Sequence, residues 1–132
     1  MTLRLLAVLA LASGCGEVTL SALSVAPPGK TALLDTEGDD LTLSRGTAFA
    51  FECIAREGDY YGPCREATAR IEDETVGSVY ASYLDTLAPA YDEGETGPRS
   101  RTAFVVVGLH EGRTDIHVDT SDGDITIDLR VE

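Results

Sequence analysis

Alternate residues near the C-terminal end of this chain carry side chains that could bind a divalent cation. Asp115, His117 and Asp119 are spaced by two, which places their side chains on one face if the segment is a β-strand. Carboxylates and imidazoles are common ligands of divalent metals. Alternate side chains on a flat strand lie about 7 Å apart, however, and cross-strand charge pairs explain the same residues. The three residues are therefore weak candidates, and the sequence predicts no bound metal and no cofactor.

The three cysteines divide into one N-terminal residue, Cys15, and one pair, Cys53 and Cys64. The segment that ends at Cys15 directs export, as described below, and exported chains meet an oxidising environment. We therefore predict a disulfide between Cys53 and Cys64, which stabilises the fold by about 3 kcal/mol on the chain-entropy model. A metal site at this pair is disfavoured, because no second cysteine pair or nearby histidine completes a set of four ligands.

Motifs of catalysis are missing from the sequence. It contains no Gly-x-Ser-x-Gly, no His-Glu-x-x-His, no phosphate-binding glycine loop and no cofactor fingerprint. Of its two histidines, His110 lies in a turn bounded by glycines and His117 lies on a predicted strand. We therefore expect no catalytic residues and no enzymatic activity. The formal net charge of -13 makes nucleic acid and anionic lipid poor partners.

Residues 1–15 have the organisation of an export signal. Arg4 supplies a positive charge, and the apolar run over residues 5–12 is too short to span a membrane. The residues Ala-Ser-Gly-Cys at 12–15 resemble the lipobox of bacterial lipoproteins, in which small residues precede a cysteine that is acylated and becomes the new N-terminus. The resemblance implies a signal peptide over residues 1–14 and lipid on Cys15. Ala12 stands where lipoproteins prefer Leu, so a plain secretory signal is the alternative.

The same resemblance implies where the protein resides. Lipid on Cys15 would anchor the chain to a membrane, with residues 15–19 as a short tether. Gly16 follows the cysteine where some lipoproteins have Asp, and in this it is similar to outer-membrane lipoproteins. We therefore expect a lipid-anchored protein of the cell envelope, with the outer membrane favoured and the domain facing either the periplasm or the cell surface.

From Glu17 onward the chain has no helical period, whereas short alternating runs bounded by Gly, Pro and Asp recur. In the clearest run, residues 124–132, every second residue from Ile125 to Val131 is apolar. The other runs cover residues 18–25, 41–43, 47–56, 67–72, 78–84, 102–109 and 113–119. The sequence is thus all-β, and about eight short strands favour a β-sandwich over an open sheet.

The last two runs are predicted to form a hairpin. Asp122 and Gly123 lie between them, and Asp-Gly flanked by alternation is a strong hairpin signal. With these two residues at the centre of the turn, Val118 faces Ile127 on the core side. The same register pairs Ile116 with Leu129 there, and on the outer face it pairs Arg113 with Glu132, Asp115 with Arg130 and His117 with Asp128.

Three segments carry a resemblance to a known domain family. Leu-Ser-Val-Ala-Pro at residues 23–27, Leu-Ser-Arg-Gly-Thr at 43–47 and Gly-Leu-His-Glu-Gly at 108–112 resemble the bacterial Ig-like domain of the group-2 type, found in surface and periplasmic proteins. The resemblance implies an Ig-like β-sandwich of about seven to eight strands over residues 20–132. The chain lacks the usual Trp, and Cys53 and Cys64 are too close in sequence to form the inter-sheet disulfide of antibody domains.

A disulfide between Cys53 and Cys64 would constrain a loop with Asp59, Tyr60 and Tyr61 at its tip. Tyrosines on a constrained loop offer contact area at a low entropic cost, so these three residues are the candidate partner-binding loop. The alternative is that one tyrosine packs over the end of the sandwich. The connection over residues 85–101 exceeds ordinary loop lengths and is either functional or flexible.

These features predict a lipid-anchored envelope protein whose Ig-like domain binds or scaffolds a protein or glycan partner without enzymatic activity. Two alternatives remain. One is a structural subunit of an envelope assembly that docks a partner by strand addition, and the other is a cation-dependent adhesion domain.

Overall fold

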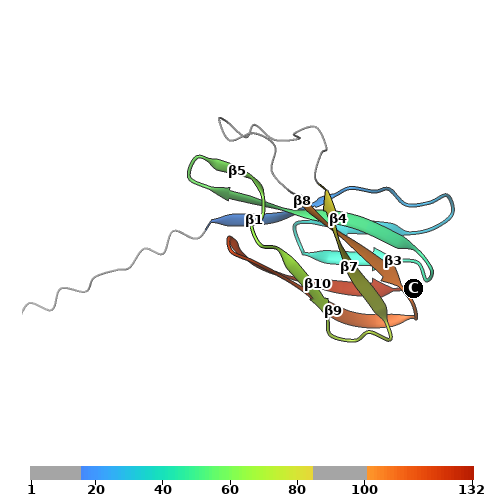
Figure 1. Cartoon of the computed structure of the whole chain (residues 1–132). Coiled ribbons are helices and arrows are strands. Elements are labelled where there is room, and N and C mark those ends of the chain that lie inside the picture. The colour runs from blue at the N-terminus through green and yellow to red at the C-terminus, as the bar shows by residue number, and fades with distance from the viewer. Residues whose placement is uncertain (1–15, 85–100) are drawn as a thin grey trace, which may run out of the picture.

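The computed structural model describes residues 16–84 and 101–132 (Figure 1). The predicted signal peptide, the predicted lipid site Cys15 and residues 85–100 lie outside the described residues. The described part is all-β and contains ten strands. No helix in this part is long and apolar enough to cross a membrane.

The strands follow one another along the chain as β1 (Glu17–Ala22), β2 (Ala32–Asp35), β3 (Asp40–Leu43), β4 (Ala48–Glu57), β5 (Tyr60–Pro63), β6 (Thr68–Ile71), β7 (Gly77–Leu84), β8 (Arg101–Gly108), β9 (Gly112–Thr120) and β10 (Gly123–Val131).

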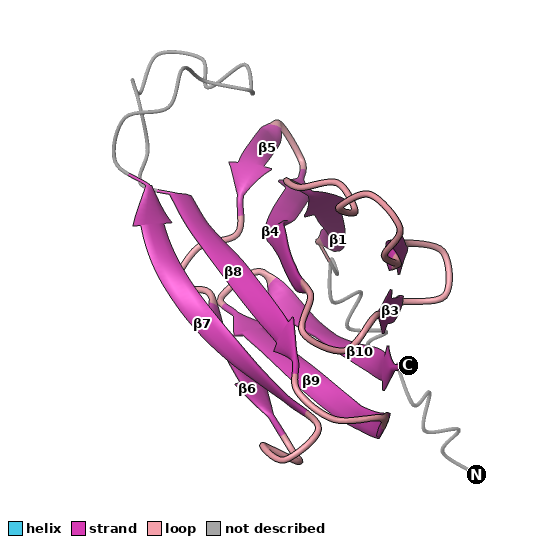
Figure 2. Ribbon diagram, turned by 90° about the vertical axis from the view of Figure 1, so that its right-hand side faces the viewer, coloured by secondary structure: helices cyan, strands magenta, loops and turns pink. Residues whose placement is uncertain are grey.

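Two sheets pack face to face as a sandwich (Figure 2). The first sheet has the order β1-β4-β8-β7, with β5 paired to β4, and the second has the order β2-β3-β10-β9-β6. Strands β1, β4, β8 and β7 occupy the places of A, B, E and D in an immunoglobulin domain, and β6, β9 and β10 occupy those of C, F and G. The predicted Ig-like β-sandwich is therefore confirmed, and its described part has ten strands where seven to eight were expected, with β2, β3 and β5 beyond these seven places.

The core between the sheets is formed by the apolar residues that alternate with polar ones along the strands. In β10 every second residue from Ile125 to Val131 is buried and its neighbours are not. At the centre, Phe51 of β4 and Phe104 of β8 are fully buried, with ring centroids 5.6 Å apart. The two residues lie opposite each other on adjacent strands of the first sheet. Burying each of them between the sheets stabilises the fold by about 1.5 to 3 kcal/mol.

All the strands predicted from the sequence are present with small shifts at their ends, but β2 and β5 were not predicted. Burial alternates along β2, but its exposed position is occupied by Leu33, which is 64% exposed. The sequence of the strand therefore shows two adjacent leucines and no apolar–polar alternation. In β5, Gly62 and Pro63 are poor strand formers, and pairing with β4 from Ile54 to Glu57 imposes the extended conformation.

The predicted register of the last hairpin is wrong by two residues. Val118 pairs with Ile125 and His117 with Thr126, so Ser121 and Asp122, not Asp122 and Gly123, form the turn. Since side chains alternate with a period of two, a shift of two keeps every residue on its predicted face.

The three charge pairs expected on the outer face are consequently absent. Asp115 instead lies opposite Asp128, and Arg113 lies opposite Arg130. Like charges directly opposite one another destabilise a sheet. The register is therefore set by contacts other than these pairs.

Contacts within and around the turn explain the shift. The hydroxyl of Thr120 accepts hydrogen bonds from the N–H groups of Asp122 and Gly123 at 3.0 and 3.1 Å and donates one to the Gly123 carbonyl at 2.7 Å. Gly123 has a φ of 148°, and a Cβ there would lie 2.9 Å from a methyl group of Val18. The glycine is thus required at the first position of β10.

Cys53 and Cys64 form the predicted disulfide, with their Cα atoms 5.3 Å apart. The bridge joins β4 to the residue that follows β5, where the Cys64 N–H also donates to the Cys53 carbonyl at 3.0 Å. Both cysteines are buried. The bond therefore closes the β4–β5 hairpin within one sheet and does not link the two sheets.

Replacing both Cys53 and Cys64 by Ala is expected to destabilise the protein by about 3 kcal/mol, because the short loop is then free in the unfolded chain. Urea unfolding of the oxidised wild type and the double variant would measure this difference. The wild type in reductant serves as the matched control and should lose a similar amount. Equal unfolding midpoints for all three would contradict the prediction.

Candidate functional site

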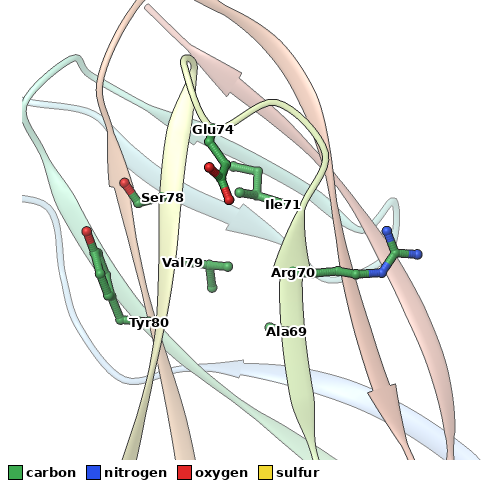
Figure 3. A pocket seen from close by; sticks show the side chains of 7 residues that line it. All are labelled: Ala69, Arg70, Ile71, Glu74, Ser78, Val79 and Tyr80. Carbon is green, nitrogen blue, oxygen red and sulfur yellow. The ribbon is translucent and has the colours of Figure 1, made fainter.

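A groove of about 440 Å³ opens between β6 and β7, the edge strands on one side of the sandwich. Figure 3 shows Ala69, Ile71 and Val79 pointing into the space between these strands, while Arg70 extends away from it and Tyr80 lies on the other side of β7. The three inward side chains are half-buried. The groove therefore has a small apolar floor with polar and charged side chains around it.

The outer edge of β7 is unusual among the free edges of the two sheets. No described strand pairs with it, it runs over eight residues, and it contains no charged residue and no proline. The other strands with a free edge are shorter: β1, β2 and β6 each carry a charge, and β5 is four residues long and ends in a proline. Natural sheets usually protect a long edge with charge, proline or shortness.

The sandwich is also open beside this edge. Ala81 lies opposite Phe104 in the register and so shares the inner face of the sheet. Phe104 is fully buried, whereas Ala81 is exposed. Described residues therefore leave both the backbone and part of the inner face of β7 accessible to another chain.

The residues of the candidate partner-binding loop, Asp59, Tyr60 and Tyr61, differ in their exposure to solvent. Asp59 lies in the turn between β4 and β5 and is exposed. Tyr60 is half-buried, its hydroxyl donates to the Pro63 carbonyl at 2.6 Å, and the guanidinium of Arg65 lies 4.7 Å from the centre of its ring. Tyr61 is 49% exposed. The packing alternative thus applies to Tyr60, while Asp59 and Tyr61 stay on the surface.

A clamp that the sequence did not reveal joins the two sheets at the same end. The backbone N–H of Arg65 donates to Asp122 Oδ2 at 2.7 Å, and the guanidinium donates to Oδ1, with Nε at 2.9 Å. Arg65 follows the disulfide, whereas Asp122 lies in the β9–β10 turn. The Asp122 side chain is completely covered, and these hydrogen bonds from Arg65 lower the pKa of its carboxyl below the usual value.

Two of the three weak metal candidates meet on the outer face of the second sheet. The ligand atoms of Asp115 and His117 lie within 4.8 Å of one another and of a carboxylate oxygen of Glu72, which follows β6. His117 Nε2 lies 2.8 Å from Glu72 Oε1, and Nδ1 lies 3.1 Å from the Thr126 hydroxyl. Asp119 is not part of this group. The sequence could not indicate Glu72, because its place beside β9 depends on sheet pairing.

The corrected register also aligns carboxylates across the same face. Asp128 lies opposite Asp115 on one side and Asp40 on the other, and Asp35 lies opposite Asp40. Nearby, burial first and the charges of Asp40 and Asp35 second raise the pKa of Asp39 above its ordinary value. A row of carboxylates therefore crosses this face, beside the arginines Arg113 and Arg130.

Two further polar contacts have structural roles. His110 Nδ1 lies 2.8 Å from the Thr75 carbonyl, which ties the turn before β9 to the turn before β7. Glu52 and Arg101 form a buried ion pair with distances of 2.6 and 3.0 Å. Glu52 is only 3% exposed, although it lies on the face of β4 away from its neighbours Phe51 and Cys53.

The sequence matches no protein-family model, and no curated protein matches it. Among solved structures, domains 4 and 5 of the S-layer protein SbsC are similar over 88% of this chain and 53% of that one, with 14% identity and a TM-score of 0.51. Domains 5 and 6 of the same protein are similar over 77% of this chain and 45% of that one, with 15% identity and a TM-score of 0.51. This chain thus spans about half the length of those structures, and at such identity the likeness concerns the fold.

Replacing Asp122 by Asn is expected to destabilise the protein by about 1 to 3 kcal/mol at pH 7, because charged hydrogen bonds to Arg65 are lost. The pKa of the Asp122 carboxyl is lower in the folded protein than in the unfolded chain, where it is about 4, so the carboxylate stabilises the fold fully above pH 4. This contribution is lost as the pH falls through the lower pKa of the folded protein. Urea unfolding between pH 7 and pH 2 would show the difference shrinking below pH 4. Asp119→Asn, an exposed change on β9, is the control, and a difference from wild type that does not vary with pH would contradict the assignment.

Proposed function

We propose that this protein is a lipid-anchored component of the bacterial cell envelope whose Ig-like domain is a structural module that docks a partner and catalyses no reaction. The anchor rests on the lipobox-like residues 12–15. The module rests on the sandwich, and the likeness of its fold to domains of an S-layer protein supports a structural role at the cell surface.

The observation that carries the docking function is the open edge of β7. An extended segment of a partner can add to such an edge through main-chain hydrogen bonds while its side chains enter neighbouring pockets. The groove between β6 and β7 lies beside the edge and offers Ala69, Ile71 and Val79 to one face of the added strand. Because the chain carries a net charge of -13, a second copy is repelled and a segment with basic residues is favoured.

The position of the tether favours this edge over the tyrosine hairpin. Gly16, which follows Cys15, lies against Arg56 and Glu57 of β4 and against Asp122, at the end of the sandwich that carries Tyr61. An anchor at Cys15 would hold that end near the membrane. The β6–β7 turn lies at the opposite end, where Gly77 pairs with Gly108, and would project away from the membrane.

Replacing Cys15 by Ala is expected to move the protein from the membrane fraction to the soluble fraction, since the lipid is its anchor. Mass spectrometry of the membrane-extracted wild type should find diacylglycerol on Cys15. Cys53→Ala with Cys64→Ala is the control, and it should leave the protein in the membrane. A wild-type N-terminus that is cut elsewhere and carries no lipid would contradict the anchor.

Replacing Ala81 by Lys is expected to reduce recovery of the partner complex at least about tenfold, because an inward-pointing charge blocks strand addition. Native electrophoresis of detergent-extracted membranes would measure the complex. Leu33→Lys places the same charge on the exposed edge strand β2 and is the matched control. Unfolding curves check that both variants fold.

Loss of the complex with Leu33→Lys but not with Ala81→Lys would place the interface on the second sheet. A wild type that migrates as a monomer under all extraction conditions would contradict docking altogether.

A further inference from the structure

We propose that Glu72, Asp115 and His117 bind a single Zn²⁺ ion on the outer face of the second sheet. Their ligand atoms all lie within 4.8 Å of one another. Zinc ligands stand at about 2.0 to 2.2 Å from the metal, which places two ligands of a tetrahedral ion roughly 3.5 Å apart. Small side-chain rotations therefore bring the three groups around one ion, with water as the fourth ligand.

The histidine is already oriented for this role. His117 Nδ1 lies 3.1 Å from the Thr126 hydroxyl on the neighbouring strand. In the metal-free protein the 2.8 Å contact with Glu72 needs a proton on Nε2, which donates to the carboxylate. When a metal replaces that proton, Nδ1 carries the remaining one and the imidazole donates to Thr126. Metal-bound histidines nearly always have such a partner on their second nitrogen.

The backbone beneath the two carboxylates is held by sheet pairing. The N–H of Glu72 donates to the Asp115 carbonyl at 3.0 Å, which continues the β6–β9 pairing past the end of β6. Asp115 lies within β9 between two strands. Two of the ligands are thus on rigid sheet, and the third adjoins it.

Charge on this face also favours a cation. Asp115 lies opposite Asp128, and Asp128 lies opposite Asp40, so like charges face one another across three strands at a cost to the sheet. A divalent ion at Asp115 offsets this repulsion. Three arginines on this face oppose binding: Arg70 lies opposite His117, and Arg113 and Arg130 lie opposite one another. The carboxylates of the face outnumber them.

The ligand types select the metal. Calcium and magnesium prefer sites made wholly of oxygen, whereas zinc accepts imidazole and carboxylate together. The contact of 2.8 Å between His117 and Glu72 also suits a simple ion pair. A titration with metal separates the two, because only a zinc site binds zinc through His117 and Glu72 and discriminates against calcium.

The test is isothermal titration of the purified, metal-free protein with ZnCl₂ and, separately, with CaCl₂. We expect one zinc per chain, binding weakened at least about tenfold by His117→Ala and by Glu72→Gln, and unchanged binding in Asp119→Asn. Asp119 lies two residues further along the same exposed face and is the matched control. Glu72→Gln alters an exposed turn and keeps the test valid if His117→Ala unfolds.

Zinc binding that survives both His117→Ala and Glu72→Gln would overturn the proposal, as would the absence of any zinc binding. Calcium binding of equal strength that ignores His117→Ala would also overturn it, because the face would then be only an acidic surface. The site lies on the second sheet and does not depend on the docking edge, so the two proposals fail independently.

Discussion

The structure depends on one constraint, that each strand of the two sheets must present one apolar face to the other sheet. Phe51 and Phe104 meet at the centre, and the apolar residues of β9 and β10 complete a core with almost no solvent exposure. Because side chains alternate along a strand, the same residues that fill the core fix which residues face solvent. Everything available for function therefore lies on the outer faces, in the turns or at the edges of the sandwich.

A second layer of contacts acts at one end of this sandwich. The disulfide between Cys53 and Cys64 holds the β4–β5 hairpin, and Arg65 immediately after it reaches across to Asp122 in the β9–β10 turn. That contact accompanies a turn centred on Ser121 and Asp122. The resulting register brings Asp115 opposite Asp128 and produces the carboxylate row on the outer face. The clamp between Arg65 and Asp122 thus occurs together with the register that produces this charge pattern.

A sandwich of this kind hosts many functions, so the fold alone assigns none. What this chain adds to the fold is a segment before β1 whose residues 12–15 resemble a lipobox, and an uncharged edge at β7 beside a groove with an apolar floor. The proposed anchor point and the groove lie at opposite ends of the domain, an arrangement suited to display. The outer face of the second sheet, with its histidine and carboxylates, is a separate surface with a chemistry of its own.

Much of the architecture was determined by the sequence itself, because alternation of apolar residues is a local property. The sequence predicted every described strand except β2 and β5, the inward faces of β9 and β10, and the disulfide. It did not predict β2 and β5, whose extended conformation depends on pairing with a neighbour, or the register of the last hairpin. Asp115 and His117 were recognised as possible ligands, but Glu72 and the Arg65 to Asp122 clamp were not. These join residues far apart in the chain, and only the packing of the strands brings them into contact.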